Sequence, residues 1–447
     1  MQKNQILQLD IENVGINGEG VARHEGVVVF VKGALPGERV RAKIIGVKKN
    51  FSYAILDGDD AFVSEKSKMR VVAPCPVFGK CGGCSIMHVN YARQLEIKRE
   101  LVRDTLKKVG GIEFDVAPTV ASDKELGYRN KMSLPIRSVN GELKIGLFAS
   151  SSHRVVETAD CLLQPKWNAV IISLIRKFMG ESGLKAYDEQ TGKGDVRHLV
   201  VREVEKHLFV TVVATRKIKL DGFKKLLEQN FDSFSLWLNI NSRKDNVILG
   251  DDWIKIYGAG EIASVEGFKT TIHPAGFFQV NDYIREKIYS LVVKTVEERA
   301  PDCVIDAYSG AGIMTAMLSK HCKSVTGIEI NEQASQSALN LIKDNGICNM
   351  TAICGDVADH IGKVTATYNG KKVTVVLDPP RSGCDKSVLE AISGANVSDV
   401  VYVSCSPATL ARDLGYLKDY FEIKSITPFD MFPQTMNVEN VAWLTRK

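Results

Sequence analysis

Residues 303–320, CVIDAYSGAGIMTAMLSK, decide the fold of the C-terminal part of the chain. An apolar strand ends at Asp306, and a glycine-rich turn leads from it into a segment with helical spacing. Residues 324–331, SVTGIEIN, predict a second strand that ends in Glu329. Strands and helices keep alternating to the C-terminus. This pattern predicts a multidomain α/β protein whose last part is a Rossmann-like nucleotide-binding domain.

Carboxylates stand at the ends of the predicted strands. Glu329 is placed to accept hydrogen bonds from both ribose hydroxyls of a nucleoside. Asp356, in AICGDVADHI, ends a third strand, where it can accept a hydrogen bond from an adenine amino group. Because a pyrophosphate needs hydrogen-bond donors and not acids, this pattern favours an adenosine-containing ligand over NAD.

The fourth predicted strand, VTVVLDPPRSG, ends with Asp378 in front of two prolines. The prolines keep the backbone extended and lift Asp378 into the crevice at the carboxyl end of the sheet. There the side chain can accept a hydrogen bond from a cofactor or from a nucleobase amide. A structural helix cap is the alternative interpretation.

Cys405 follows the fifth predicted strand in residues 400–413, VVYVSCSPATLARD, and precedes a helix that Pro407 opens. A thiol at the carboxyl end of a strand reaches the ligand crevice, so Cys405 is our candidate nucleophile. The alternative is a small buried hydrophobic side chain. Glu439 stands just before the last apolar segment, VAWL, and a surface carboxylate is the ordinary interpretation of such a residue.

Three cysteines, Cys75, Cys81 and Cys84, fall within ten residues that also contain flexible glycines. Such a loop can wrap one metal centre, and Cys161 is the nearest later cysteine that can complete a set of four thiolates. Zinc and an iron–sulfur cluster both fit four thiolates. A surface loop with three thiols is the alternative, and His88 is a possible replacement for Cys161 as a ligand.

Residues 1–62 consist of short alternating runs separated by glycine-rich turns, which predict a small OB-like β-barrel. Lys43, Lys48 and Lys49 stand beside Phe51, a combination that follows a phosphate backbone and stacks a base. A solvated basic edge strand is the alternative. The segment resembles the TRAM domain, an RNA-binding module.

The chain has 447 residues, of which 45% are hydrophobic and 25% charged, and a formal net charge of +5. These values fit a soluble protein of several domains, and the positive charge permits a polyanionic partner without demonstrating one. No apolar run approaches the roughly 20 residues of a membrane span, and we see no secretory signal. We therefore expect a cytoplasmic protein without membrane contact, whose ten cysteines serve metal binding or catalysis and not disulfides.

Residues 63–270 predict a central domain of mixed strands and helices that contains the cysteine loop. Its segment 91–120, which begins with a basic amphipathic helix, is a candidate for packing on the C-terminal domain. Arg129, Lys131 and Arg137 lie on basic strands and are candidates for contacts with phosphates.

The order of IHPAGFFQVN, DAYSGAGI, GIEIN, LDPPRSG, VSCSPATLARD and FPQTMNVE resembles the RNA (uracil-5-)-methyltransferase family along nearly the full chain. With the cysteines and the TRAM-like start, it looks most like the bacterial 23S rRNA (uracil-5-)-methyltransferases that carry a [4Fe-4S] cluster. The resemblance implies a class I methyltransferase domain over residues 271–447, S-adenosylmethionine as methyl donor, and RNA as partner of a monomeric enzyme.

The same resemblance implies roles for single residues. Cys405 would be the nucleophile and Glu439 the base that removes a proton. The residues that would bind S-adenosylmethionine are Gln279, Tyr308, Glu329 and Asp378, with Asp356 as an addition. The cluster ligands would be Cys75, Cys81, Cys84 and Cys161. The sequence departs from the family at Asn437, where many members have histidine, and we expect this residue to tune the surroundings of Glu439.

Three alternatives stay open at this point. A tRNA T-loop uracil-5-methyltransferase would use the same chemistry on another RNA, and a non-catalytic RNA-binding protein would keep only the fold. A radical S-adenosylmethionine enzyme would also combine a cluster with this cofactor. Its C-x3-C-x2-C spacing is absent, because five residues separate Cys75 from Cys81.

Overall fold

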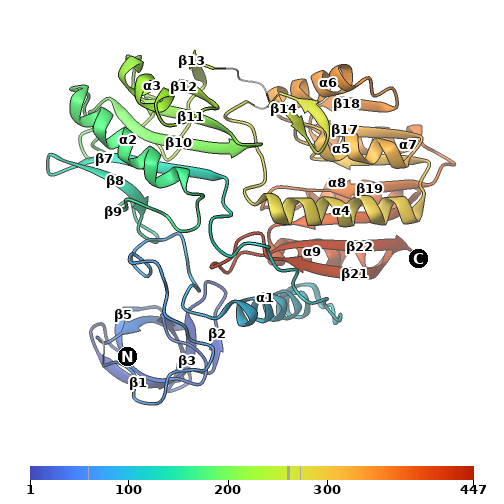
Figure 1. Ribbon diagram of the computed structural model, residues 1–447. Helices are drawn as coiled ribbons and strands as arrows, with labels where there is room; N and C mark the ends of the chain where they lie inside the picture. The colour runs from blue at the N-terminus through green and yellow to red at the C-terminus, as the bar shows by residue number, and fades with distance from the viewer. Residues whose placement is uncertain (59, 259–261, 272) are drawn as a thin grey trace.

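The computed structural model describes residues 1–58, 60–258, 262–271 and 273–447. Figure 1 shows three sheet-centred parts: a blue barrel at the N-terminus, a green central sheet and an orange-red sheet at the C-terminus. Among the described residues, no helix has both the length and the apolar composition that a bilayer crossing requires.

The N-terminal part is a six-stranded barrel-like sheet in the order β1-β5-β6-β4-β3-β2. Alternate apolar side chains, such as Val29, Val40 and Ile44, fill its interior. This confirms the predicted β-rich start. The strands are β1 (Ile6–Asp10), β2 (Asn13–Val14), β3 (Gly20–His24), β4 (Val27–Lys32), β5 (Arg39–Val47) and β6 (Phe51–Leu56).

The central sheet has seven strands in the order β13-β12-β11-β10-β7-β8-β9, and most neighbours are antiparallel. Helices α2 (Trp167–Glu181) and α3 (Asp221–Glu228) pack on one of its faces through a core of aliphatic side chains. The strands are β7 (Lys131–Val139), β8 (Glu142–Phe148), β9 (Val155–Glu157), β10 (Val196–Val204), β11 (His207–Ala214), β12 (Phe234–Ile240) and β13 (Asp252–Tyr257).

The C-terminal sheet has the order β18-β17-β16-β19-β20-β22-β21. All pairs are parallel except those of β22, which lies antiparallel between β20 and β21 and so brings Glu439 next to the end of β20. The strands are β16 (Cys303–Ala307), β17 (Ser324–Glu329), β18 (Met350–Cys354), β19 (Val373–Leu377), β20 (Val397–Ser404), β21 (Phe421–Phe429) and β22 (Glu439–Arg446).

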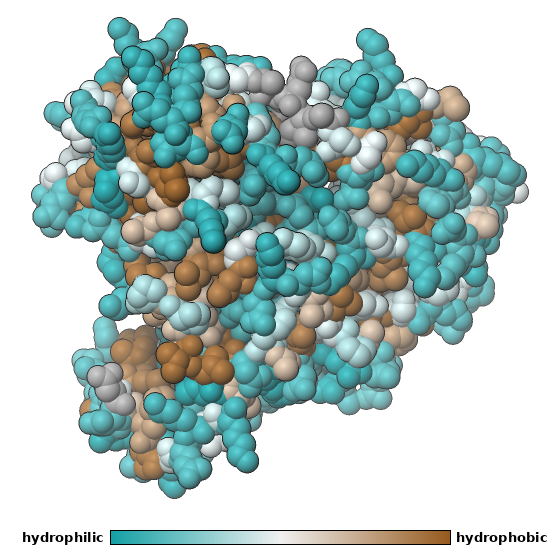
Figure 2. Space-filling view, in the orientation of Figure 1, coloured by the Kyte–Doolittle hydropathy of each residue, from teal (hydrophilic) through white to brown (hydrophobic). Residues whose placement is uncertain are grey.

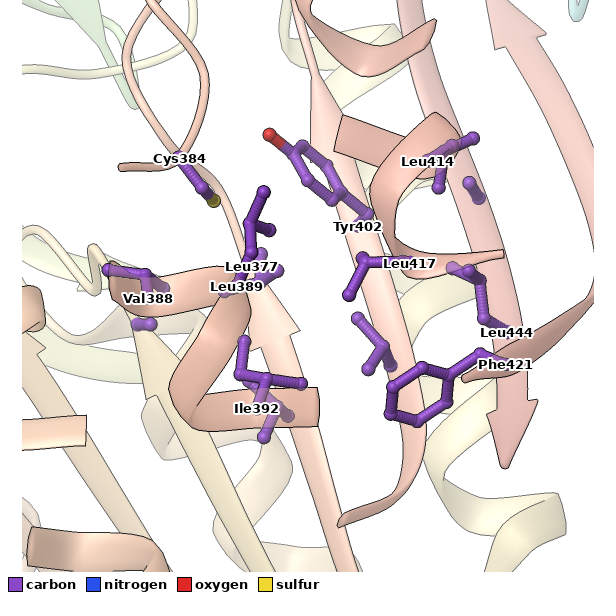
Figure 3. Close-up of a cluster of buried hydrophobic side chains, with 14 of the residues drawn as sticks. Leu377, Cys384, Val388, Leu389, Ile392, Tyr402, Leu414, Leu417, Phe421 and Leu444 are labelled. Atoms are coloured by element: carbon purple, nitrogen blue, oxygen red, sulfur yellow. The ribbon is translucent and has the colours of Figure 1, made fainter. Parts of the chain in front are cut away.

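Helices cover both faces of this sheet, as the apolar strands require. One face packs against α4 (Asp282–Arg299), α5 (Ile313–Leu318) and α6 (Glu332–Asn345). The other packs against α7 (Val357–Thr367), α8 (Lys386–Gly394) and α9 (Pro407–Leu417). Figure 3 shows the second core, in which Tyr402 of β20 lies among Leu377, Leu414 and Leu417.

The segment after the cysteine loop packs on the C-terminal sheet. Helix α1 (Tyr91–Thr105) and the π-helical turn Leu106–Gly110 contact α9 and β21. Lys98 and Asp430 form an ion pair whose side chains are both fully buried, and the backbone N–H of Val120 donates to Pro428 O at 2.8 Å. The hairpin of β14 (Ile262–Val265) and β15 (Phe268–Thr270) also contacts α6. The exact domain boundaries stay a prediction.

Candidate active site

The glycine-rich turn after β16 builds one wall of a cavity. Tyr308 has a φ of +66°, and Gly312 has a φ of +81°, where an added Cβ would lie 2.9 Å from the Cβ of Ala338. Glu329 holds the turn in place, since its Oε2 accepts a hydrogen bond from the N–H of Gly310 at 2.9 Å and its Oε1 accepts one from Asn331 N at 2.7 Å. Each carboxylate oxygen keeps a free lone pair for a ligand hydroxyl.

Most of the predicted cofactor residues meet at this turn. Gln279, Tyr308 and Asp378 line one cavity. Glu329 lines an adjoining cavity, which shares Phe277, Gly310 and other residues with the first. Such a cavity at the carboxyl ends of parallel strands is the usual ligand position in this class of sheet.

Asp356 lies at the edge of this group and lines neither cavity. One of its carboxylate oxygens caps α7 by accepting a hydrogen bond from Ala358 N at 2.9 Å. The pKa of Tyr308 is raised mainly by burial, then by Cys384 and Asp385, and also by the charge of Asp356. Because Tyr308 lines the cavity, this effect places Asp356 close to it. Its adenine-binding role stays a prediction.

Two carboxyl groups, the buried Asp306 and the half-buried Asp378, line the first cavity. The pKa of Asp306 is raised to about 7. Burial is the main cause, a hydrogen bond from Thr315 opposes the shift, and the charge of Glu329 adds to it. Burial also raises the pKa of Asp378 to about 7, with Asp306 contributing. A positively charged ligand would favour the ionised forms of both groups.

Cys405 lies where the sequence placed it, between β20 and α9. Ser406 caps the helix by accepting a hydrogen bond from Thr409 N at 3.4 Å, and Pro407 occupies its first turn. The half-buried thiol is therefore next to a helix N-terminus, whose partial positive charge stabilises a thiolate.

Cys405 shares its surroundings with two acids and one arginine. Burial raises the pKa of Cys405 to about 11; Glu439 and Asp378 add to this shift, and Arg381 opposes it. Glu439 is only 4% exposed, and burial followed by the charge of Asp378 raises its pKa to about 8. Sequence reasoning did not single out Arg381, although its position three residues after Asp378 was a usable signal.

The buried carboxylate of Asp413 links the loop after β19 to β20 and α9. Asp413 of α9 accepts hydrogen bonds from Cys384 N at 2.9 Å and from the hydroxyl of Tyr402 at 2.6 Å. Gly383 packs closely against Asp413, since a Cβ there would lie 2.7 Å from Oδ2 of Asp413. The segment that carries Asp378 and Arg381 is thereby fixed against the helix that follows Cys405.

The four predicted metal ligands lie near one another and are all free thiols. The pKa of Cys84 is raised to about 12, chiefly by burial and also by the charges of Cys161, Cys81 and Cys75. Among the described residues, however, no group of three or more Cys, His, Asp or Glu side chains is arranged to hold a single metal ion. Four thiolates are the donor set of either a zinc ion or an iron–sulfur cluster.

The structure shows no hydrogen bond of His88 with the four cysteines or of Asn437 with Glu439 among the described residues. Burial lowers the pKa of His88 to about 4, and the charges that act on it are those of Arg70 and Glu38, not those of the four cysteines. Asn437 is exposed, and its backbone N–H donates to Oγ1 of Thr435 at 3.2 Å.

The predicted RNA-contact residues divide into two groups. Lys48 and Lys49 are exposed at the β5–β6 turn, beside a cluster of Phe30, Phe51 and Tyr53 with ring centroids 5.3–5.9 Å apart. Figure 2 shows brown, hydrophobic side chains at the surface of this barrel. Arg137, in contrast, is 4% exposed and paired with Glu189, so its prediction as a phosphate contact is wrong.

Comparison with known proteins identifies the fold and the family. The sequence pattern of tRNA (uracil-5-)-methyltransferases matches residues 90–447, which is more than three quarters of the chain. The chain belongs to this family. The pattern of the TRAM domain matches residues 2–56, so the N-terminal barrel is a TRAM domain.

Relatives match the methyltransferase over its full length. Proteins named uncharacterized RNA methyltransferase from Listeria monocytogenes and Clostridium acetobutylicum are each 36% identical to it, and the alignments cover 99% and 100% of this chain and 98% of either relative. A solved structure, the Pyrococcus abyssi tRNA (uracil-54, C5)-methyltransferase in complex with S-adenosyl-L-homocysteine, superposes with a TM-score of 0.78. It is 27% identical and covers 98% of this chain and 100% of its own.

Proposed function

We propose that this methyltransferase transfers a methyl group from S-adenosylmethionine to carbon 5 of a specific uridine in 23S rRNA, through a covalent adduct with Cys405. The observation that carries the proposal is the meeting of Cys405, Glu439 and Asp378 beside the cavity of Gln279 and Tyr308. A nucleophile, a buried carboxyl base and a nucleoside pocket are the three parts that this reaction needs.

Carbon 5 of uracil is a weak nucleophile, so the base must be activated first. The thiol of Cys405 first loses its proton to solvent. The resulting thiolate adds to carbon 6, and the electrons of the 5,6 double bond move to the carbonyl oxygen at carbon 4. Carbon 5 then attacks the methyl group, and the electron pair of the methyl–sulfur bond stays on the departing sulfur. Positive charge from Arg381 and the α9 N-terminus supports the thiolate.

Glu439 completes the reaction as the general base. It takes the proton from carbon 5, the 5,6 double bond re-forms, and Cys405 leaves as a thiolate. Because burial raises the pKa of Glu439 to about 8, we expect adduct breakdown to speed up as the pH rises to about 8. The target uridine must be unstacked for both ring faces to be reached.

The cofactor contacts follow from the cavity. Glu329 would accept hydrogen bonds from the ribose hydroxyls, Asp356 would contact adenine, and Gln279, Tyr308 and Asp378 would surround the methionine part. The carboxyl groups Asp306 and Asp378 suit a ligand that carries a sulfonium cation.

A [4Fe-4S] cluster held by Cys75, Cys81, Cys84 and Cys161 is the metal centre that we propose. The mutual proximity of these free thiols supports it. When bound, the cluster would brace the cysteine loop against the segment that contains Cys161, and no step of methyl transfer runs through it. Protein purified without oxygen should be brown and contain iron; colourless, zinc-loaded protein would contradict the cluster.

A tRNA substrate is the second candidate, since the 27% identical relative of known structure methylates tRNA uridine 54. Mapping of 5-methyluridine in the rRNA and tRNA of cells that lack the gene decides between the two. Loss of one or more 23S rRNA modifications supports our proposal, and loss of tRNA modification alone supports the second. The division into residues 1–62, 63–270 and 271–447 and the cytoplasmic location remain part of this proposal.

A further inference from the structure

Helices α2 and α3 cover one face of the central sheet, and the other face packs in part, around Phe209, on residues such as Phe268 and Phe278. Strand register places Lys131 opposite Arg202, and Lys255 opposite Trp237. Side chains directly opposite each other in neighbouring strands point to the same face. The register across β10, β11 and β12 puts both pairs on one face. We call this the basic face, and it comprises Lys131, Arg202, Trp237, Trp253 and Lys255.

Several cations lie close together on the basic face. Lys131 and Arg202 are like charges directly opposite each other, an arrangement that destabilises a sheet. Arg129 adds a third cation two residues before Lys131. Among the described residues, none of these three side chains forms an ion pair with a carboxylate. The pKa of Lys131 is lowered to about 8, first by burial and then by the charges of Arg202 and Arg129. The protonated form of Lys131 is therefore less stable in the folded protein than in water.

Aromatic rings continue the same face. Trp253 lies in edge contact with His273 at 4.8 Å between ring centroids, and with Trp237 at 6.3 Å. All three side chains are half-buried. His273 also lines the cavity that contains Glu329, so the aromatic rings extend from the basic face to the cofactor cavity. Aromatic rings with an accessible edge or face beside cations are a feature of sites that bind single-stranded nucleic acid.

Arg202 and Arg129 connect the basic face with the active site. Arg202 is 2% exposed, and its guanidinium donates to the carbonyl oxygen of Gly276, in the segment that ends in Gln279. Arg129 forms a β-bridge with Asn281, and its guanidinium lies 5.9 Å from the ring of Phe432. These contacts place the basic face next to the segment that leads to the cofactor cavity.

We propose that the basic face binds the single-stranded RNA that flanks the target uridine, with Lys131 and Arg129 contacting phosphates and Trp253 stacking on a base. This inference rests on the proposed function for the identity of the RNA, but it concerns binding and not methyl transfer. Arg202 is too deeply buried to contact a phosphate and raises the positive potential from behind. A polyanion would relieve the charge crowding that the free protein carries.

Binding of a fluorescein-labelled oligouridylate, measured by anisotropy over a series of KCl concentrations, tests the proposal. Lys131→Gln should weaken binding about tenfold and lower the slope of log K against log salt by about 0.7, the value for one phosphate of a single strand. Trp253→Ala should weaken binding about tenfold with an unchanged slope. Lys177→Gln, which removes an exposed lysine on α2, is the matched control and should change neither value.

Two further measurements, of thermal stability and of cofactor affinity, distinguish a loss of RNA contacts from unfolding and from damage to the cofactor cavity. The melting temperature of Lys131→Gln should be equal to or higher than that of the wild type, because the substitution removes a like-charge contact; Lys131→Arg should retain the salt slope. The affinity for S-adenosylmethionine should not change in any variant. An unchanged salt slope in Lys131→Gln, or a loss of cofactor affinity in place of RNA affinity, would overturn the proposal. None of these measurements requires methyl transfer. The binding proposal can therefore be rejected while the proposed function stands, and the reverse is also true.

Discussion

The two seven-stranded sheets hold ionisable groups of opposite sign in buried or half-buried positions. The C-terminal sheet carries Asp306, Asp378 and Glu439 at its strand ends, each with a raised pKa. The central sheet carries Lys131 and Arg202, whose pKa values burial lowers to about 8 and about 10. Both arrangements weaken the free protein, and both suit a ligand of the opposite charge.

The difference assigns one ligand to each sheet. A sulfonium is a cation, and the acidic strand ends of the C-terminal sheet surround the place where we put it. RNA is a polyanion, and the basic face of the central sheet adjoins that place through Gly276. In each sheet, a ligand of opposite charge removes an unfavourable interaction of the ligand-free protein, and this gain contributes to the free energy of binding.

The largest effect should come from the C-terminal sheet alone. Cys405→Ala should lower methyl transfer by about 10⁴-fold or more, because the nucleophile is lost, while RNA and cofactor affinities stay the same. Cys303→Ala is the matched control, since Cys303 is a buried thiol at the opposite end of the same sheet. Transfer from labelled S-adenosylmethionine to RNA measures both. Substantial residual transfer by Cys405→Ala would remove the thiol from the mechanism.

Thermal stability should depend on pH in opposite directions for the two sheets. Asp306, Asp378 and Glu439 have higher pKa values folded than unfolded, so the stability they contribute is complete below about pH 4 and is lost as the pH rises through about 7 to 8. The melting temperature of ligand-free protein should therefore fall by roughly 5–10 °C between pH 5 and pH 8.

Variants sharpen this pH prediction. Asp306→Asn should flatten the fall, because one of the three titrating groups is gone. Lys131 behaves in the opposite sense: its folded pKa of about 8 lies below the unfolded value, so stability should rise again from about pH 8 to pH 10. Lys131→Gln should remove that rise. A melting temperature that increases steadily from pH 5 to pH 8 in scanning calorimetry would contradict the buried-acid account.

A smaller effect should distinguish the cofactor from its product. S-adenosylmethionine is a cation at sulfur and S-adenosylhomocysteine is neutral, so ionisation of Asp306 and Asp378 near pH 7 should favour the former. We expect the ratio of the two affinities to increase about three- to tenfold between pH 6 and pH 8. Titration calorimetry at the two pH values measures it, and a constant ratio would show that neither acid faces the sulfonium.

The sequence predicted the parts of the site that lie at strand ends. Short apolar runs and the residues just after them locate Glu329, Asp378 and Cys405 without knowledge of strand pairing, because all parallel strands end at one edge. The position of Glu439 could not be predicted in this way, because it depends on strand pairing. It lies beside Cys405 because β22 runs antiparallel between β20 and β21, and such long-range pairing leaves no local signal in the sequence.

Residues that act from other elements were predicted less well. Arg137 was a candidate for an RNA contact because it lies on a basic strand, but its partner Glu189 is far away in the sequence. Arg202 was not singled out, although it lies directly opposite Lys131. Cross-strand register decides which basic side chains share a face, and periodicity within one strand does not reveal it.

The covalent adduct tests the central claim most directly. Glu439→Gln removes the base, so methylated uridine should remain attached to Cys405 when the variant is incubated with S-adenosylmethionine and RNA from cells that lack the gene. Trypsin should release residues 387–412, in which Cys405 is the sole cysteine, and mass spectrometry should find this peptide carrying a 5-methyluridine nucleotide after nuclease digestion. An unmodified peptide, together with methylated RNA released at the wild-type rate, would contradict the account.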